Sequence, residues 1–263
     1  MAAGAALILV APYAIAATST RVVSRLDVPD LVSSPRLLEA VDVARRLGGP
    51  DLSVTVTTGE GPRSKVIPAA SIGVRMLVLA GSEGRPSHRL LTARADLTLA
   101  VRVGRPTVSV PVSWEPSTAR GVAVGIDGTE LSVEALDFAF QAAAARAVPL
   151  LVIHAGGDRG PQAERILAEA LAGRADEYPD VDVRRLVSTQ SATTTLLTES
   201  RTAELLVVGA RSTALAAVNP VVRRVVASSR CPVAVVPHPV SSAERDRVRR
   251  RTRESDPAVN ILY

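Results

Sequence analysis

The segment Glu204–Pro237 constrains the fold of this chain more than any other stretch. Its sequence, ELLVVGARSTALAAVNPVVRRVVASSRCPVAVVP, is typical of a buried strand, a glycine-led loop, a helix, a Cys-Pro step and a second buried strand. Apolar runs of this kind favour parallel strands that are buried on both faces. A strand that leads through a tight turn into a helix also presents backbone N–H groups to an anion. The segment therefore predicts an α/β domain with a candidate anion site at the end of a strand.

The composition indicates an interior built from aliphatic side chains. Hydrophobic residues make up 47% of the 263 residues, whereas aromatic residues make up 2%. This length suits one large domain or two domains of about 130 residues each. The net charge is a modest +5, and much of the basic excess falls in Arg245–Arg253, which we expect to be a solvated, disordered tail. No aromatic residue is interleaved with these arginines, so we expect no nucleic-acid partner.

The residue types on which many enzymes and metal sites depend are scarce. Cys231 is the single cysteine, which excludes an internal disulfide and a cysteine-based metal cluster. His88, His154 and His238 have no metal-ligand spacing, and the sequence carries no Ser-His-Asp or Cys-His signature. We therefore expect no catalytic residue, no metal site and no enzymatic activity, and we interpret Cys231 as a buried, inert side chain.

Two interpretations are open for the uncharged residues 1–20. The stretch AALILVAPYAIAA resembles the apolar core of a signal peptide and ends in small residues at Ala14–Ala16, but no Lys or Arg precedes it. As a membrane span it is short and is interrupted by Pro12. The alternative is that Ala6–Ala11 forms a buried strand, as its similarity to Pro149–Ala155 favours. We prefer the strand, and so we expect no membrane partner and a cytoplasmic location.

The chain contains two halves with the same order of segments, which indicates a tandem duplication. The matching pairs are Ser53–Ser71 with Asp182–Ser200, Arg75–Gly84 with Ala203–Ser212, and Gly104–Val112 with Ser229–Pro237. The second half also has an opening strand, Arg120–Asp127, and an Ala-rich helix, Glu130–Val148, for which the first half has no counterpart. Apolar residues at three- and four-residue steps give that helix one apolar face: Leu131, Ala135, Leu136, Ala139, Phe140 and Ala143.

The predicted organisation follows from these two halves. The alternation of strands and helices predicts open parallel sheets with helices on both faces. The predicted divisions are a degenerate first repeat at residues 1–113, a linker at 114–119, a complete second domain at 120–239 and a basic tail at 240–263. The first repeat lacks its first strand and helix.

In this order and spacing, the motifs resemble those of the universal stress protein family in its tandem two-domain form. The resemblance rests on VAVGIDGTELSVEAL from Val122, the pair His154-Ala155, LLVVGAR from Leu205 and SRCPVAVVP from Ser229. It covers roughly residues 119–239 well and residues 5–113 weakly. It implies Rossmann-like repeats with parallel five-stranded sheets, no established catalytic activity, and dimerisation through the last strands.

The resemblance also implies where a nucleotide would bind. In family members that bind ATP, an Asp after the first strand meets the adenine end, and a Gly-x-x-Gly with a later Gly-Ser or Gly-Thr holds the phosphates. The matching, vestigial ATP site of this chain would consist of Asp127, Gly128, Gly209, Ser212 and Asn219. Ser212 replaces the second glycine and narrows the approach to the backbone, while Pro220, which follows Asn219, has no N–H to donate. Asn219 and Pro220 are sufficiently explained as the N-cap and first residue of a helix.

The first half departs from the pattern in a different way. Gly81 and Gly84 keep the Gly-x-x-Gly spacing, but the Asp-bearing strand is absent and the later Gly-Ser position falls at about Ala93-Arg94. A Gly-x-x-Gly after a strand is equally expected of a tight turn. Arg89 or Arg94 could contact a phosphate, although a solvated helix face is the simpler interpretation.

These departures favour a non-catalytic stress-response or regulatory protein that acts as a pseudo-dimeric or dimeric interaction scaffold, without tight ATP binding and without a resident cofactor. Each lost charge-assisted phosphate hydrogen bond is worth about 1.5–3 kcal/mol, so the loss of several would weaken binding by orders of magnitude. No Walker lysine or acidic metal pair adjoins the loop, so we expect no hydrolysis. We expect protein partners or self-association through the terminal strands. The alternative is an ATP-binding regulatory module that uses the C-terminal domain alone.

Overall fold

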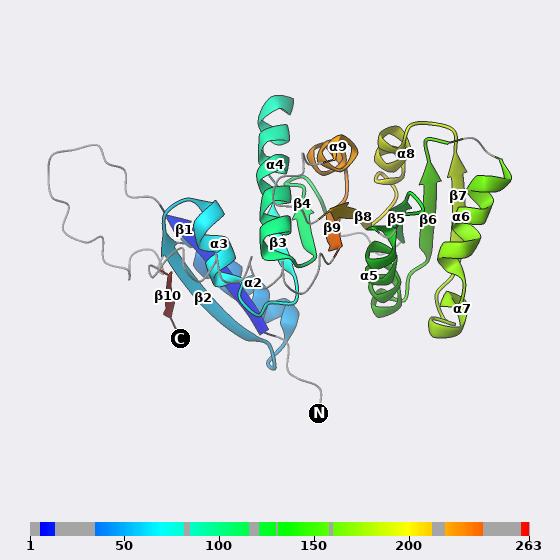
Figure 1. Ribbon diagram of the computed structural model, residues 1–263. Helices are drawn as coiled ribbons and strands as arrows, with labels where there is room; N and C mark the ends of the chain where they lie inside the picture. The colour runs from blue at the N-terminus through cyan, green and yellow to red at the C-terminus, as the bar shows by residue number, and fades with distance from the viewer. Residues whose placement is uncertain are drawn as a thin grey trace, which may run out of the picture. The chain divides into compact units, whose positions relative to one another are not determined.

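The structure is a computed structural model that describes residues 6–13, 35–81, 85–115, 121–129, 131–157, 160–211, 219–238 and 259–262. The chain divides into two compact units, Met1–Ile72 with Arg249–Tyr263, and Gly73–Val248. We refer to them as unit 1 and unit 2 and describe each by itself (Figure 1). Ser212, Gly84 and the arginine-rich tail Arg245–Arg253 lie outside the described residues.

Unit 2 is built on a seven-stranded sheet with the strand order β3-β4-β9-β8-β5-β6-β7. Its strands are β3 (Leu77–Ala80), β4 (Thr107–Val110), β5 (Val122–Ile126), β6 (Leu150–Ala155), β7 (Val183–Ser188), β8 (Leu205–Arg211) and β9 (Val233–His238). The five strands of the second half, from β9 to β7, are all parallel to their neighbours. The predicted parallel five-stranded sheet of the second domain is therefore confirmed.

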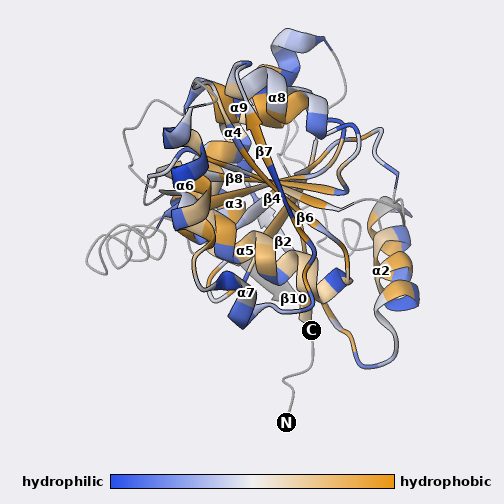
Figure 2. Ribbon diagram, turned by 90° about the vertical axis from the view of Figure 1, so that its right-hand side faces the viewer, coloured by the Kyte–Doolittle hydropathy of each residue, from blue (hydrophilic) through white to orange (hydrophobic). Residues whose placement is uncertain are grey.

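Helices cover both faces of this sheet (Figure 1). They are α4 (Pro86–Val103), α5 (Leu131–Arg146), α6 (Pro161–Leu171), α7 (Arg174–Glu177), α8 (Ala192–Glu199) and α9 (Pro220–Ser228). One apolar cluster joins α5 and α6 to one face, and another joins α4, α8 and α9 to the opposite face. Figure 2 shows the hydrophobic strands of the sheet between these helices. No helix among the described residues has the length and apolar character needed to cross a membrane.

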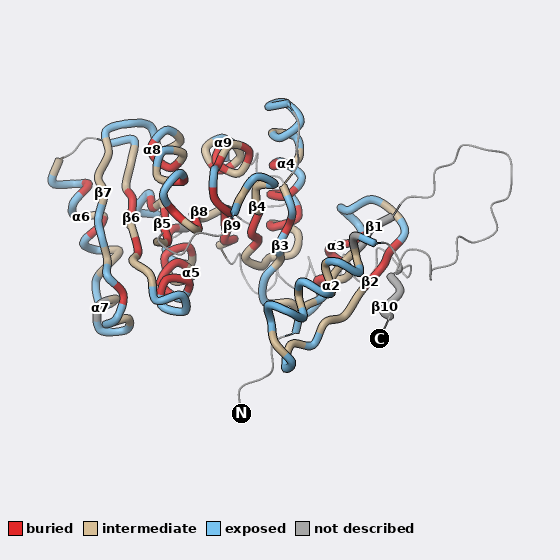
Figure 3. Tube along the Cα trace, turned by 180° about the vertical axis from the view of Figure 1, so that it is seen from behind, coloured by how far each residue is buried: buried red, intermediate tan, exposed pale blue. Residues whose placement is uncertain are grey.

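Helix α5 shows why the sequence pattern was informative. The predicted apolar face is buried at Ala135, Leu136, Ala139, Phe140 and Ala143, and Figure 3 shows the helix largely buried along this face. Alanines at these positions let the helix approach the sheet closely. Phe140 supplies the bulk and stacks on Tyr178, with the ring centroids 5.1 Å apart. Cys231, at 0% exposure, is confirmed as a buried residue.

The two halves of the sequence meet through their last strands. β4 pairs with β9 in the antiparallel direction, so that Val108 lies opposite Ala234. Helix α4 of the first half packs on α9 of the second half, with Leu97 and Ala100 in the same cluster as Val222. Both edges of β4 and of β9 are thereby used within the chain.

The described residues of unit 1 form a small sheet with two helices. Its elements are β1 (Ala6–Tyr13), α2 (Pro35–Gly48), β2 (Ser53–Glu60), α3 (Arg63–Ala70) and β10 (Val259–Leu262). β1 runs parallel to β2, which confirms that Ala6–Ala11 forms a strand. The prediction that this strand is buried is wrong, because Ile8 is 38% exposed and none of residues 6–10 is buried. β10 pairs with the other edge of β2 in the antiparallel direction. The prediction of disorder throughout residues 240–263 is wrong at 259–262, because the branched apolar residues of Val-Asn-Ile-Leu suit a strand.

The compact units do not follow the predicted division at residue 113. β3 and β4 match the second-half strands β8 and β9 in sequence, yet they extend the sheet of unit 2. In the second half, β5 lies between β6 and β8 and joins them into one sheet. The first half has no counterpart of β5, so its strand pairs β1–β2 and β3–β4 belong to different sheets. The boundary between the two sequence repeats, near residue 113, therefore differs from the boundary between the two compact units, which follows Ile72.

Candidate functional site

A cavity of about 510 Å³ lies in unit 2 at the carboxyl ends of β5 and β8. The strand order changes direction here, since β6 follows β5 on one side and β8 flanks it on the other. Parallel sheets hold ligands at such a point. Three of the predicted site residues line the cavity: Asp127 after β5, Gly209 in β8 and Asn219 before α9. We call it the β5–β8 cavity.

The first half of the chain contributes to the wall of the β5–β8 cavity, and sequence analysis did not anticipate this. Leu97 and Val101 of α4 lie in the wall beside Val222 of α9. Their contribution depends on the pairing of β4 with β9, which brings α4 across the end of the second half. No local motif in the sequence marks these two residues.

One carboxylate oxygen of Asp127 is hydrogen-bonded within its own loop. Its Oδ1 accepts hydrogen bonds from the backbone N–H of Thr129 at 2.9 Å, the hydroxyl of Thr129 at 2.6 Å and the hydroxyl of Ser132 at 2.8 Å. Ser132 also accepts a hydrogen bond from the backbone N–H of Asp127. Burial opposes ionisation of this carboxyl group, but the hydrogen bonds from Thr129 and Ser132 outweigh it, and the pKa of Asp127 is lowered from its ordinary value. The side chain thus fixes the start of α5.

We expect Asp127→Ala to lower the free energy of unfolding by about 1–2 kcal/mol at pH 7, as for the loss of a helix cap. Because the folded-state pKa is lowered, the contribution of the carboxylate is complete above the unfolded pKa of about 3.9 and is lost as the pH falls through the folded-state value. Urea unfolding, followed by the fluorescence of Trp114 in unit 2, measures the loss of stability at pH 7. The same experiment at about pH 3 measures how the loss depends on pH. Glu169→Ala, at an exposed carboxylate on α6, is the control and should cost less than about 0.5 kcal/mol. Equal losses in the two variants at both pH values would contradict this role.

Gly128 does not line the cavity with the other predicted residues. Its φ of 80° lies in the left-handed region, where a side chain is strained, and a Cβ atom would lie 3.1 Å from Ile166. The turn between β5 and α5 therefore explains this glycine without a ligand.

Asn219 and Pro220 start helix α9 as predicted. The side-chain oxygen of Asn219 accepts a hydrogen bond of 2.9 Å from the backbone N–H of Val221, and Pro220 is the first helical residue. The cap satisfies an N–H group that an anion would otherwise contact. The wall of the cavity includes no Lys or Arg among the described residues, and the carboxylate of Asp127 adds negative charge to it.

Gly81, which follows β3 and corresponds to Gly209 of the second half, has a structural explanation. The N–H of Gly81 donates a 2.7 Å hydrogen bond to the carbonyl oxygen of Val110, and a Cβ atom at Gly81 would lie 2.8 Å from that oxygen. The placement of the later Gly-Ser position at Ala93-Arg94 is wrong, because both residues lie inside α4. Helix α4 begins at Pro86, after the N-cap Arg85, and has 18 residues where α9 has 9. Counting back from the following strand by the length of the shorter second-half helix therefore stopped inside α4, short of its start.

The described residues contain no group of three or more His, Cys, Asp or Glu side chains that could hold a metal ion. His154 lies at the end of β6, where its Nδ1 is 3.1 Å from the carbonyl oxygen of Ile126. Since a carbonyl oxygen only accepts, Nδ1 carries the proton in this contact. His154 thus joins the ends of two neighbouring strands.

Comparison with known proteins finds a family match in the second half. Residues 119–237 match the universal stress protein family. The chain is 33% identical over 178 residues to universal stress protein Rv1996 of Mycobacterium tuberculosis. This alignment covers 58% of this chain and 55% of that protein. The chain is 35% identical over 151 residues to universal stress protein Rv2005c of the same organism, which covers 51% of each. The chain thus spans about half the length of these curated relatives.

The fold is similar to solved structures over most of the chain. A universal stress protein from Archaeoglobus fulgidus superimposes with a TM-score of 0.65 at 15% identity and covers 89% of this chain and 86% of its own. The functionally unknown protein PA1789 from Pseudomonas aeruginosa superimposes with a TM-score of 0.59 at 15% identity and covers 94% and 86%. At this identity, the likeness shows the fold alone.

Proposed function

We propose that this chain, whose residues 119–237 match the universal stress protein family, is a non-catalytic stress-response protein that acts as an interaction scaffold without tight ATP binding. The observation that carries this proposal is the chemistry of the β5–β8 cavity. A triphosphate needs cationic side chains or unpaired N–H groups, and the described wall offers a carboxylate, a capped helix end and mainly apolar side chains.

The arrangement of strands supports the scaffold. The antiparallel β4–β9 pair joins the two halves within one chain, so the contact expected between last strands takes an intramolecular form. The sheet of unit 2 then ends at β3, where Val78 is 55% exposed and the preceding Met76 is 46% exposed. Its counterpart β8 is flanked by the parallel strand β5. We place the contact with another protein at this edge of β3, as an added parallel strand.

The second candidate is a regulatory module that binds ATP through the second half alone. The size of the β5–β8 cavity favours it, since about 510 Å³ accommodates a nucleoside. Asp127 and Asn219 stand at the two positions that the resemblance assigns to the adenine and phosphate ends. Weak binding of the nucleoside part is compatible with the scaffold, whereas micromolar binding of ATP is not.

Calorimetric titration with ATP and magnesium distinguishes the two candidates. We expect no saturable heat up to about 1 mM ATP, because the phosphates lack partners worth several kcal/mol. The matched variants are Ala192→Phe, which fills the cavity from the first residue of α8, and Thr198→Phe, which adds the same ring on the exposed side of that helix. Micromolar binding that Ala192→Phe abolishes and Thr198→Phe preserves would establish the ATP module and overturn the scaffold proposal.

A further inference from the structure

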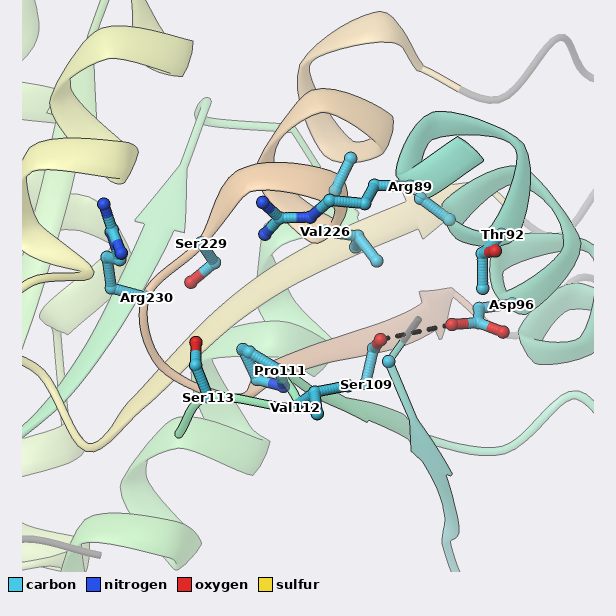
Figure 4. A pocket seen from close by; sticks show the side chains of 13 residues that line it. Arg89, Thr92, Asp96, Ser109, Pro111, Val112, Ser113, Val226, Ser229 and Arg230 are labelled. Carbon is cyan, nitrogen blue, oxygen red and sulfur yellow. Dashed lines mark hydrogen bonds between the residues drawn. The ribbon is translucent and has the colours of Figure 1, made fainter. Parts of the chain in front are cut away.

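We propose that a second cavity in unit 2 binds a compact phosphate monoester that carries a hydrogen-bond donor, and no second anionic group, at its other end. This cavity has a volume of about 310 Å³ and shares no lining residue with the β5–β8 cavity. It lies between α4, the end of β4 and the turn that leads from α9 to β9 (Figure 4). We call it the α4–α9 cavity.

One end of the α4–α9 cavity is cationic. Figure 4 shows Arg89 extending from α4 across the last turn of α9 towards Ser229, with Arg230 beyond that serine. Both arginines are exposed and line the cavity, and neither forms an ion pair with a carboxylate within the described part of the chain. The hydroxyl group of Ser113 lies at the same end. Two guanidinium groups and a hydroxyl are donors that suit the oxygens of a phosphate.

The other end of the cavity is acidic. Asp96 of α4 is 3% exposed, and its Oδ2 accepts a hydrogen bond of 3.2 Å from the hydroxyl of Ser109. Thr92 lies one turn before Asp96 on the same face of α4 (Figure 4). A second anion at this end would be desolvated beside the carboxyl group of Asp96, whereas an amine or a hydroxyl can donate a hydrogen bond to that group. The guanidinium groups at one end and the carboxyl group at the other therefore set both the orientation and the selectivity of the ligand.

The arginines have a competing role in the structure. Helix α9 ends at this cavity, where the N–H of Ser229 donates to the carbonyl oxygen of Val225 at 2.8 Å. Cations stabilise the C-terminal end of a helix. Arg89 would then stabilise α9 in the free protein, and phosphate would not bind. If the arginines bind phosphate, a ligand should raise the stability of the protein and the acidic end should discriminate between ligands. If they only stabilise α9, neither effect should occur.

Calorimetry and thermal unfolding of the full chain with phosphoethanolamine and phosphoglycolate test the proposal. Phosphoethanolamine should raise Tm and bind at least about tenfold more tightly than phosphoglycolate, whose carboxylate would face Asp96. Arg89→Gln and Arg230→Gln should each weaken phosphoethanolamine binding about tenfold or more. The matched control is Arg94→Gln, an exposed arginine on α4 outside the cavity, which should leave binding unchanged. The filled-cavity variant Ala192→Phe should also bind normally, because its cavity is separate.

A third variant tests the acidic end. Asp96→Asn keeps an acceptor for Ser109 and adds an amide N–H that can donate to a carboxylate, so the preference for phosphoethanolamine over phosphoglycolate should fall about tenfold. If this variant does not fold, the preference of the wild-type protein still decides. The proposal is overturned if phosphoethanolamine at about 10 mM neither gives heat nor shifts Tm, if both ligands bind equally, or if Arg94→Gln weakens binding as much as Arg89→Gln.

Discussion

Replacing Phe140 with alanine is expected to lower the free energy of unfolding of unit 2 by about 3–5 kcal/mol. The ring is fully buried, stacks on Tyr178 and lies in a cluster otherwise dominated by Val, Leu and Ala. Only two phenylalanines occur in the chain, and the small side chains around this one cannot extend to fill the space it would leave. The loss therefore combines transfer of the ring to water with the cost of a cavity.

Urea unfolding followed by the fluorescence of Trp114 measures this effect in unit 2 alone. Trp114 is the single tryptophan, and it packs against the cluster that holds α4, α8 and α9 to the sheet. The matched control is Val133→Ala on the same helix, where the side chain is 49% exposed and the expected loss is within about 0.5 kcal/mol. A loss below about 1 kcal/mol for Phe140→Ala would mean that α5 does not pack through this ring.

The second half of the fold could be predicted from the sequence because its information is local. The apolar runs at Leu205–Arg211 and Val233–His238, and the Ala-rich face of Leu131–Arg146, each specify an element and its buried side. Once the elements alternate as strand and helix, the parallel order follows from the preference for right-handed crossovers. Asn219 and Pro220 could be placed for the same reason, since capping depends on neighbouring residues.

The contacts between the halves could not be predicted in this way. Thr107–Val110 has the composition of a buried strand, but nothing in it specifies an antiparallel partner at Val233–Val235. The omission of Leu97 and Val101 from the candidate site follows directly, because they reach the cavity only through that pairing. The strand at Val259–Leu262 was missed for another reason: four residues after a long polar tail carry too little periodicity to predict a strand.

Val108→Asp provides a direct test of the β4–β9 pairing, with an expected loss of about 3 kcal/mol or more at pH 7. Val108 is 8% exposed, lies opposite Ala234 and belongs to the cluster formed by α5 and the second-half strands. A carboxylate at this position would be buried, and burial raises the pKa of a carboxyl group. The folded-state pKa would lie above the unfolded value, so the loss should be largest above the folded-state value and should diminish as the pH falls below it.

Hydrogen exchange locates the effect of Val108→Asp along the chain. We expect β3, α4 and β4 to lose protection together, while β5, β6 and β7 keep theirs, because the second half has its own parallel sheet. The matched control is Val78→Asp on β3, where the same change falls on a side chain that is 55% exposed and should cost within about 0.5 kcal/mol. If β5–β7 lost protection to the same extent as β4, the seven strands would unfold as one unit and the second half would depend on the first. If Val108→Asp cost as little stability as Val78→Asp, the β4–β9 pair would not be buried. That result would contradict the intramolecular contact between the last strands and the scaffold proposal that depends on it.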